Sequence, residues 1–200
     1  YSGLLRRLSS GVSARFGSEL PIVLIQLAGY GVPPTAPAES GWASLREAQR
    51  QVANEDSNMA LAIALDIGDR YDIHPPNKQE LGRRLARAAR QLVYGERISA
   101  SGPTPISATR EGDAVVVRFG DVGEALVAYG AKGPVGFELC GGVQDSCNYA
   151  TAEIRGHDVV LRSASTTEAT RVRYGWADHP VVNLFDGAGL PAGPFEISIH

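Results

Sequence analysis

Two short aliphatic runs constrain the fold of this chain most strongly. They are Pro21–Ala28 and Met59–Ile67, and each has the length of one strand. Continuous runs of this kind are typical of strands in a parallel sheet with helices on both faces. Two strands alone cannot bury their own faces or cover the helices around them. We therefore expect the remaining strands of this sheet to come from residues that are absent from this chain.

Helical patterns flank both runs. Apolar residues recur at every fourth position from Leu4 to Phe16, and Gly17 follows as a stop signal. Further helices are predicted over Trp42–Ala53 and Asn77–Val93. The resulting order, helix–strand–helix–strand–helix, is that of a doubly wound α/β fold.

Two of these helices carry N-terminal signals. Ser44 and Glu47 have the spacing of a capping box. Asn77 opens the last helix, and Glu80 follows it three positions later, which predicts an N-cap at Asn77.

The helical period ends near residue 98, and short β runs separated by glycine turns follow. Glu111–Asp113 and Arg155–Asp158 each separate two runs, which predicts two hairpins. Many short strands without helices indicate a small β-sandwich or barrel. The sequence thus predicts an α/β domain over residues 1–97 and a β domain over residues 98–200. The further β runs are Leu126–Tyr129, Val135–Leu139, Thr170–Tyr174 and Phe195–Ile199.

Composition and charge argue against several classes of partner. The 200 residues carry a formal net charge of −3, with 44% hydrophobic and 20% charged residues, as in an ordinary globular protein. Because no basic run is present, we expect neither a nucleic acid nor a membrane surface as partner. The longest apolar run, Leu20–Gly29, is too short to span a bilayer. The chain opens at Tyr1 inside an amphipathic pattern, so we expect its beginning to lie elsewhere.

The loop Asp72–Gln79 carries the strongest chemical signal. It follows the second aliphatic run, and open α/β sheets build their active sites beyond the carboxyl ends of strands. His74 lies two residues after Asp72, and a histidine beside a carboxylate is the base and orienter of a hydrolytic triad. Asp66, Asp69, Asp72 and His74 can also be interpreted as metal ligands. A third interpretation is a packed or solvated histidine, which is common for a loop histidine.

Four separated sequence blocks carry a resemblance to a known family. They are LPIVLIQLAG at 20–29, WASLREAQR at 42–50, DIHPPNKQELGRRL at 72–85 and RVRYGWADHPVVNLFDGAGLPAGPF at 171–195. Together they resemble the sialate O-acetylesterase family of the SGNH hydrolases, and the block at 72–85 is the most specific. The resemblance implies that residues 1–97 are the C-terminal part of an SGNH domain with a flavodoxin-like parallel sheet. It implies that residues 98–200 are the β-rich, β-sandwich-like region that follows.

The same resemblance implies an activity, the hydrolysis of acetyl esters on sugars by a serine triad. His74 matches the catalytic base of the family and Asp72 its acidic member, with Asp69 as the alternative orienter. The spacing here is Asp-Ile-His, whereas many relatives have Asp-x-x-His, and this changes which ring nitrogen the carboxylate reaches. The serine and oxyanion motifs of the family lie upstream and do not occur in these residues. The implied partner is therefore an N-terminal, nucleophile-bearing portion of the same esterase. The resemblance implies neither a metal nor a cofactor for the activity. The implied substrate is an acetylated carbohydrate (a sialic acid, a xylan or a xyloglucan unit).

Aromatic residues near this loop are candidates for contact with a sugar. Tyr30 and Trp42 flank the loop after the first aliphatic run, and an aromatic face complements the apolar face of a pyranose. We expect both to bind substrate, whereas Trp176 is expected to pack inside the β-rich half. His179 also lies between an acidic residue and a proline, and it is interpreted as structural.

The two cysteines, Cys140 and Cys147, lie in a stretch rich in Gly, Asp, Ser and Asn. No histidine or second cysteine pair is nearby, so a zinc site is not expected. The residues form either a short-loop disulfide or two free thiols. We expect the disulfide, and with it an oxidising compartment, periplasmic or secreted as is usual for polysaccharide esterases.

Three function classes follow from these features. The first is the C-terminal part of a carbohydrate O-acetylesterase that is active only with its N-terminal part. The second is a carbohydrate-binding module whose α/β half is a remnant, and the third is a structural subunit that stabilises a partner. A serine nucleophile on an accompanying portion would separate the first class from the other two.

Overall fold

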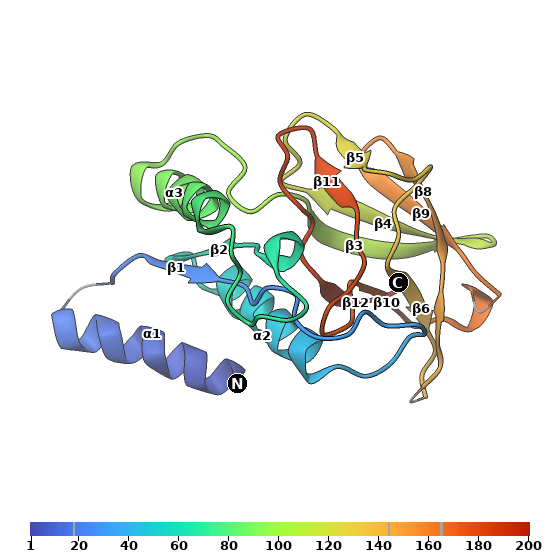
Figure 1. Ribbon diagram of the computed structural model, residues 1–200, viewed down its shortest axis with the longest axis horizontal. Helices are drawn as coiled ribbons and strands as arrows, with labels where there is room; N and C mark the ends of the chain where they lie inside the picture. Colours follow the sequence, from blue (N-terminus) through green and yellow to red (C-terminus); the bar gives the residue numbers. More distant parts are fainter. Residues whose placement is uncertain (18, 144, 165) are drawn as a thin grey trace.

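The computed structural model describes residues 1–17, 19–143, 145–164 and 166–200. An α/β half and a β-rich half lie side by side along the long axis of the molecule (Figure 1). The α/β half contains α1 (Ser2–Phe16), β1 (Ile22–Ile25), α2 (Gly41–Glu55), β2 (Met59–Ala62), the 3₁₀ turn η1 (Leu65–Ile67) and α3 (Lys78–Tyr94). The β-rich half contains β3 (Thr104–Glu111), β4 (Ala114–Gly120), β5 (Leu126–Ala128), β6 (Phe137–Cys140), β7 (Cys147–Tyr149), β8 (Thr151–Arg155), β9 (Asp158–Arg162), the 3₁₀ turn η2 (Thr166–Glu168), β10 (Arg171–Tyr174), β11 (Leu184–Asp186) and β12 (Phe195–Ser198).

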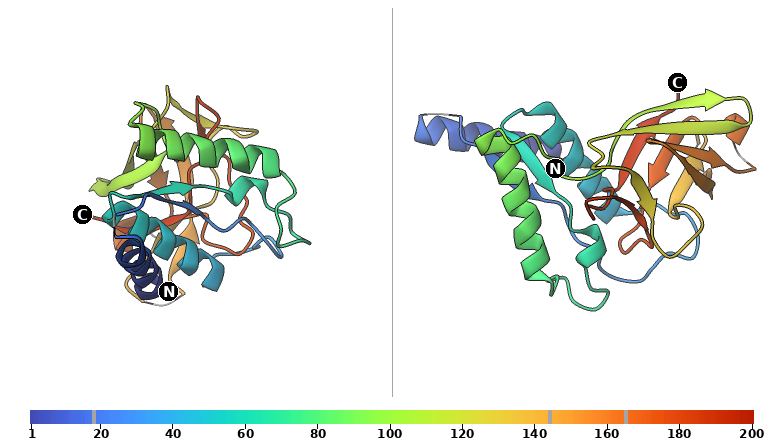
Figure 2. Two further views of the ribbon diagram at one scale, coloured as in Figure 1. Left: turned by 90° about the vertical axis from the view of Figure 1, so that its left-hand side faces the viewer. Right: turned by 90° about the horizontal axis from the view of Figure 1, so that it is seen from above.

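The strands β1 and β2 form a parallel pair, in register from Ile22 opposite Met59 to Ile25 opposite Ala62. The helices α2 and α3 lie on opposite sides of this pair (Figures 1 and 2). The predicted order of helices and strands in this half is confirmed, but both strands are shorter than predicted. At the end of β1 the N–H of Gln26 still donates to the carbonyl of Ala62 at 2.9 Å, while its side-chain Nε2 donates to the carbonyl of Arg46 on α2 at 3.1 Å.

The helix α1 forms as predicted and ends at Gly17, whose φ of 70° is the left-handed conformation of a helix cap. Its predicted apolar stripe, however, faces outward in this chain. Leu4, Leu8 and Phe16 are 68%, 58% and 69% exposed, and the buried residue of α1 is Leu5. None of the helices in the described ranges is long and apolar enough to cross a membrane.

Of the two helix N-termini predicted from the sequence, one is confirmed and the other is wrong. Asn77 caps α3, because its Oδ1 accepts from the backbone N–H of Glu80 at 3.1 Å. The capping box predicted at Ser44 is wrong, because α2 begins earlier. Ser40 is its N-cap and accepts from the N–H of Ala43 at 2.9 Å.

The β-rich half is built from two four-stranded antiparallel sheets, ordered β12-β10-β6-β7 and β3-β4-β9-β8, and one antiparallel pair, β11-β5. Residues of both sheets pack into one core that includes Phe119, Leu161, Phe137, Tyr174 and Phe195. The two predicted hairpins are confirmed as β3–β4 and β8–β9. The strands β7 and β11 were not predicted, because each has only three residues and no alternating pattern.

The disulfide Cys140–Cys147 joins the facing ends of β6 and β7. The two sulfurs are 2.03 Å apart, and the two residues are partners in the antiparallel register. Closing so short a loop restricts the unfolded chain and contributes roughly 2 kcal/mol by the loop-entropy model.

Arg46 joins the two halves of the molecule. Its side chain is fully buried on α2, and its guanidinium donates to four backbone carbonyls. Two of these follow β1, at Leu27 (2.8 Å) and Ala28 (2.6 Å), and two belong to the β-rich half, at Ala177 (2.7 Å) and Asp178 (2.8 Å). Burial lowers the pKa of Arg46 to about 10, while the nearby charge of Asp178 opposes this effect. The four carbonyl oxygens thus replace the hydrogen bonds to water that the buried guanidinium has lost.

Replacing Arg46 should therefore destabilise the whole chain. We expect Arg46→Met to lower the free energy of unfolding by about 3 kcal/mol or more, because it removes the guanidinium donor from four backbone carbonyls, of which that of Asp178 keeps the N–H of Tyr30. Arg46→Lys should recover only part of this loss, since an ammonium cannot reach all four. Urea denaturation measures the effect, with Arg83→Met on the exposed face of α3 as the control. Equal stability of the Arg46→Met and Arg83→Met variants would contradict this role.

Candidate functional site

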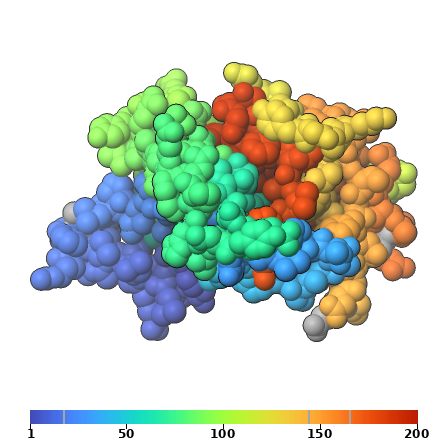
Figure 3. All heavy atoms as spheres, viewed as in Figure 1, coloured from blue at the N-terminus to red at the C-terminus, as the bar shows by residue number. Residues whose placement is uncertain are grey.

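The loop that carries the Asp/His pair is held at the carboxyl end of the parallel strands. A Cβ placed on Gly68 would lie 2.1 Å from the carbonyl oxygen of Gly29, so only glycine permits this backbone approach. The N–H of Gly31 donates to the carbonyl of Arg70 at 3.1 Å. On the face shown in Figure 3, the segment after β2 accordingly lies against the segment after β1.

Within this loop, Asp72 contacts His74 directly. One carboxylate oxygen of Asp72 lies 3.0 Å from Nδ1 of His74 and also accepts the backbone N–H of His74 at 2.8 Å. The backbone hydrogen bond, followed by the one to the ring, lowers the pKa of Asp72 below its usual value. A carboxylate at Nδ1 favours the tautomer with a free lone pair on Nε2, which is the form that accepts a proton. The side chain of His74 is 82% exposed, so a reacting group can reach it.

The other acidic candidates have different contacts. Asp69 accepts the N–H of Tyr71 at 2.7 Å, which makes it a turn residue in this structure. Asp66 forms a two-point ion pair with Arg84, with distances of 2.6 and 2.7 Å. The structure therefore brings Asp72, rather than Asp69, to His74, and the Asp66 carboxylate points to α3.

Tyr30 and Trp42 lie together at the same edge. Their ring centroids are 6.3 Å apart, and the side chain of Tyr30 is partly exposed. The loop of Tyr30 lies beside that of His74 through the bond from Gly31 to Arg70. Tyr30 is thus on a loop beside that of the Asp/His pair, and Trp42 lies in the first turn of α2 next to Tyr30.

His179 lies in the seam, the contact surface between the α/β half and the β-rich half. A Cβ added to Gly29 would be 3.1 Å from its Nδ1, so the ring packs directly on the loop after β1. That Nδ1 is buried and has no hydrogen-bond partner among the described residues. The preceding Asp178 accepts the hydroxyl of Ser40 at 2.5 Å, and its carbonyl accepts the N–H of Tyr30 at 3.1 Å. This Asp/His pair therefore contributes to packing between the halves.

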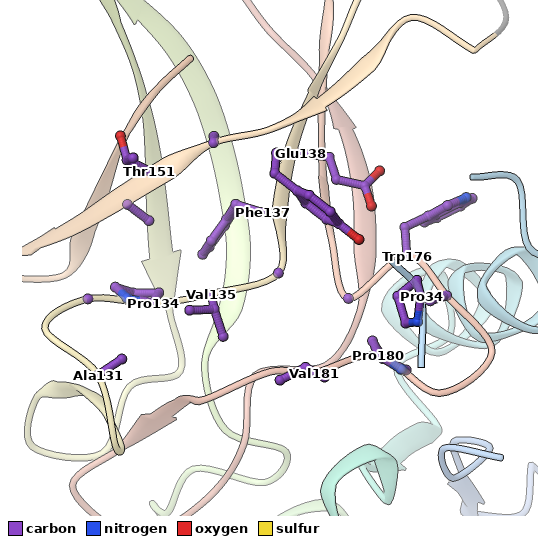
Figure 4. Close-up of a pocket in the computed structure, with 17 residues that line it drawn as sticks. Pro34, Ala131, Pro134, Val135, Phe137, Glu138, Thr151, Trp176, Pro180 and Val181 are labelled. Atoms are coloured by element: carbon purple, nitrogen blue, oxygen red, sulfur yellow. The ribbon is translucent and has the colours of Figure 1, made fainter. Parts of the chain in front are cut away.

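A second feature, a cavity of about 570 Å³, was not predicted from the sequence. Its wall includes Glu138, Tyr149 and Trp176 together with prolines and valines (Figure 4). Trp176 is buried as expected, and the guanidinium of Arg173 lies 4.4 Å from the centre of its ring. The signal in the sequence that could have indicated the cavity is Glu138, an acid between Phe137 and Leu139 in an apolar strand.

The carboxyl group of Glu138 is electrostatically unusual. It is 2% exposed, and its Oε2 has no hydrogen-bond partner in the described part of the chain. Burial raises the pKa of Glu138 to about 7, although the charge of Arg173 lowers it, while Glu39 and Glu196 raise it further. Arg173 cannot offset the burial fully because it already pairs with Glu196 at 2.5 Å and Glu39 at 2.9 Å.

This raised pKa predicts a pH dependence of stability. Because the folded state holds the proton of Glu138 more tightly than the unfolded state, stability should fall as the pH rises from about 4.5 to about 7. The contribution is on the order of 3 kcal/mol. In the Glu138→Gln variant, the free energy of unfolding should no longer show this decrease between pH 5 and pH 8. Urea denaturation at the two pH values measures it. The exposed Glu153→Gln variant is the control and should follow the wild type. Parallel losses in all three proteins would show that Glu138 does not titrate in this range.

Comparison with known proteins finds a likeness among solved structures. No protein-family model and no curated protein matches the chain. Among solved structures, the chain is similar to the crystal structure of a carbohydrate acetylesterase from Xanthomonas citri, with 36% sequence identity and a TM-score of 0.83. The match covers 92% of this chain, which spans 43% of the length of that protein. Both halves described above thus have a counterpart in a carbohydrate acetylesterase.

Proposed function

We propose that this chain is the C-terminal part of a carbohydrate O-acetylesterase of the SGNH type, with His74 as base and Asp72 as its orienter. The observation that carries the proposal is the 3.0 Å contact between these residues on an exposed loop at the end of β2. The likeness to a carbohydrate acetylesterase over 92% of the chain supports it. The sialate O-acetylesterase resemblance of the block at 72–85 supports the same assignment.

The chemistry follows from the geometry of the pair. A serine hydroxyl on the N-terminal portion attacks the acetyl carbonyl while Nε2 of His74 takes its proton. His74 then returns this proton to the sugar oxygen that leaves, and the acetyl group passes to water in a second step with the roles repeated. Asp72 remains ionised, because its lowered pKa keeps the carboxylate charged beside the imidazolium. Tyr30 contacts the sugar from the neighbouring loop, and Trp42 contacts it from the first turn of α2.

The N-terminal portion would cover two surfaces of the α/β half. The outer edge of β1 has no strand partner among the described residues, and Ile25 on it is exposed. The outward stripe of α1, formed by Leu4, Leu8 and Phe16, is apolar. Unpaired strand edges and apolar patches of this kind are usually covered in a complete sheet. We infer that the serine-bearing portion adds strands beside β1 and packs on α1.

The disulfide favours an oxidising compartment. Bonds of this kind persist in periplasmic and secreted proteins and are rare in reducing compartments. We therefore propose a periplasmic or secreted location, where acetylated polysaccharides are accessible.

Loss of the base should reduce the rate sharply. In the protein with its nucleophile-bearing portion, we expect His74→Ala to lower kcat for acetate release by about 10²–10⁴-fold. Asp72→Asn should have a smaller effect, because the ring keeps its position but loses the charge beside Nδ1. Substrate affinity should change little, since the imidazole acts on the transition state.

The controls for this experiment are two other histidines. His157→Ala, in the exposed β8–β9 turn, should leave turnover unchanged, and His179→Ala should act through stability alone. Turnover of the His74→Ala variant near that of the wild type would contradict the assignment. Equal damage from His179→Ala in a folded protein would show that the other Asp/His pair carries the chemistry.

If the N-terminal portion covers α1, a charged substitution in its apolar stripe should destabilise the complete protein. In the complete protein, Leu8→Asp should lower the free energy of unfolding by about 2 kcal/mol, because a charge replaces a buried apolar side chain. Val143→Asp, in the exposed β6–β7 loop, is the matched control and should have little effect. If both variants unfold at the wild-type urea concentration, α1 is not covered.

A further inference from the structure

We infer that the 570 Å³ cavity in the β-rich half is a binding site for a neutral sugar unit and that Glu138 provides its buried hydrogen-bonding group. The inference rests on the proposed function, because it takes the sugar to be part of the acetylated glycan. The cavity would be a second site, separate from the Asp/His pair, and the chemistry of that pair does not depend on it.

The cavity lies where the β-rich half meets the loop after β1. Its wall comes from β6 and the loop before it, from the β7–β8 segment, and from residues 175–181. Pro34 belongs to the loop that also carries Tyr30, and Pro180 follows His179, which packs on Gly29. In Figure 4, Pro34, Pro180 and Trp176 lie toward one side of the cavity, and Pro134 and Val135 toward the other. A glycan bound near Tyr30 can therefore extend toward this cavity.

Two residues of the wall, Glu138 and Trp176, carry a buried polar atom without a hydrogen-bond partner in the described part of the chain. Glu138 is 2% exposed, and Figure 4 shows its carboxyl group directed toward the side of Trp176. Its Oε2 has no hydrogen-bond partner among the residues that the structure describes. An unsatisfied buried oxygen destabilises the protein, and a small rotation of the Glu138 carboxyl group toward the cavity would let a ligand hydroxyl satisfy it. The rest of the wall suits the C–H face of a sugar ring and an acetyl methyl group, since it is lined by Pro34, Pro134, Val135, Val181 and the ring of Tyr149.

The charges select a neutral ligand. The described residues of the wall include one carboxyl group and neither a lysine nor an arginine. Arg173, which packs on the ring of Trp176, is already paired with Glu39 and Glu196. The carboxylate of an acidic sugar would meet the carboxyl group of Glu138 in a wall that has no lysine or arginine among its described residues. The cavity therefore favours a neutral pentose or hexose unit over a sialic or uronic acid.

Direct binding tests this inference without reference to catalysis. Isothermal titration of the whole protein would use xylohexaose and cellohexaose as neutral probes and sialyllactose as the acidic probe. We expect a neutral probe to bind at least tenfold more tightly than sialyllactose. Tyr149→Ala and Glu138→Gln should each weaken that binding by about tenfold or more. Tyr94→Ala, an exposed tyrosine at the end of α3, should leave it within twofold of the wild type.

A second assay separates this inference from the proposed function. Hydrolysis of an aryl acetate needs the Asp/His pair but not the cavity, so its turnover by the wild type reports on the proposed function alone. If the wild type hydrolyses no aryl acetate, the proposed function fails, and the titration still decides on the cavity. If the aryl acetate is hydrolysed but neither neutral probe binds, the inference about the cavity is overturned. Tighter binding of sialyllactose, or full binding in the Tyr149→Ala variant, would overturn it as well.

Discussion

The four hydrogen bonds of Arg46 are the contact on which the arrangement of this molecule depends. The guanidinium is buried between α2, the segment after β1 and the segment 177–178, and it is the side chain that these three parts share. A buried charge tolerates little displacement of its acceptors, because each lost hydrogen bond leaves an uncompensated group in an apolar environment. Arg46 therefore fixes the β-rich half against the α/β half.

This fixed seam gathers the functional features on neighbouring segments. The segment after β1 carries Tyr30 and Pro34, and it contacts the loop of His74 on one side and Asp178 on the other. The Asp/His pair, the aromatic residues and the cavity are thus connected through one short stretch of chain. An esterase acting on a polysaccharide needs this combination, since the ester must be held at the base while neighbouring sugar units are bound. The β-rich half is accordingly proposed as part of the substrate site as well as of the fold.

Local patterns were sufficient to predict much of this structure. The helices, the two hairpins, the cap at Asn77 and the contact between Asp72 and His74 all involve residues close in sequence. The seam and the cavity could not be predicted, because they depend on residues such as Arg46 and Ala177 that are distant in the chain. The exposure of the apolar stripe of α1 could not be predicted either, because it also depends on distant residues. Its period indicates a buried helix, and the surface that would bury it is proposed to lie in the N-terminal portion.

The most direct test of the central claim is covalent labelling of the nucleophile. An alkyl phosphonofluoridate reacts with a serine that a neighbouring histidine activates, and mass spectrometry then locates the label. In the protein with its N-terminal portion, we expect a single labelled serine outside residues 1–200, with labelling slowed by at least a hundredfold in the His74→Ala variant. A labelled serine within residues 1–200, or labelling at an equal rate without His74, would contradict it.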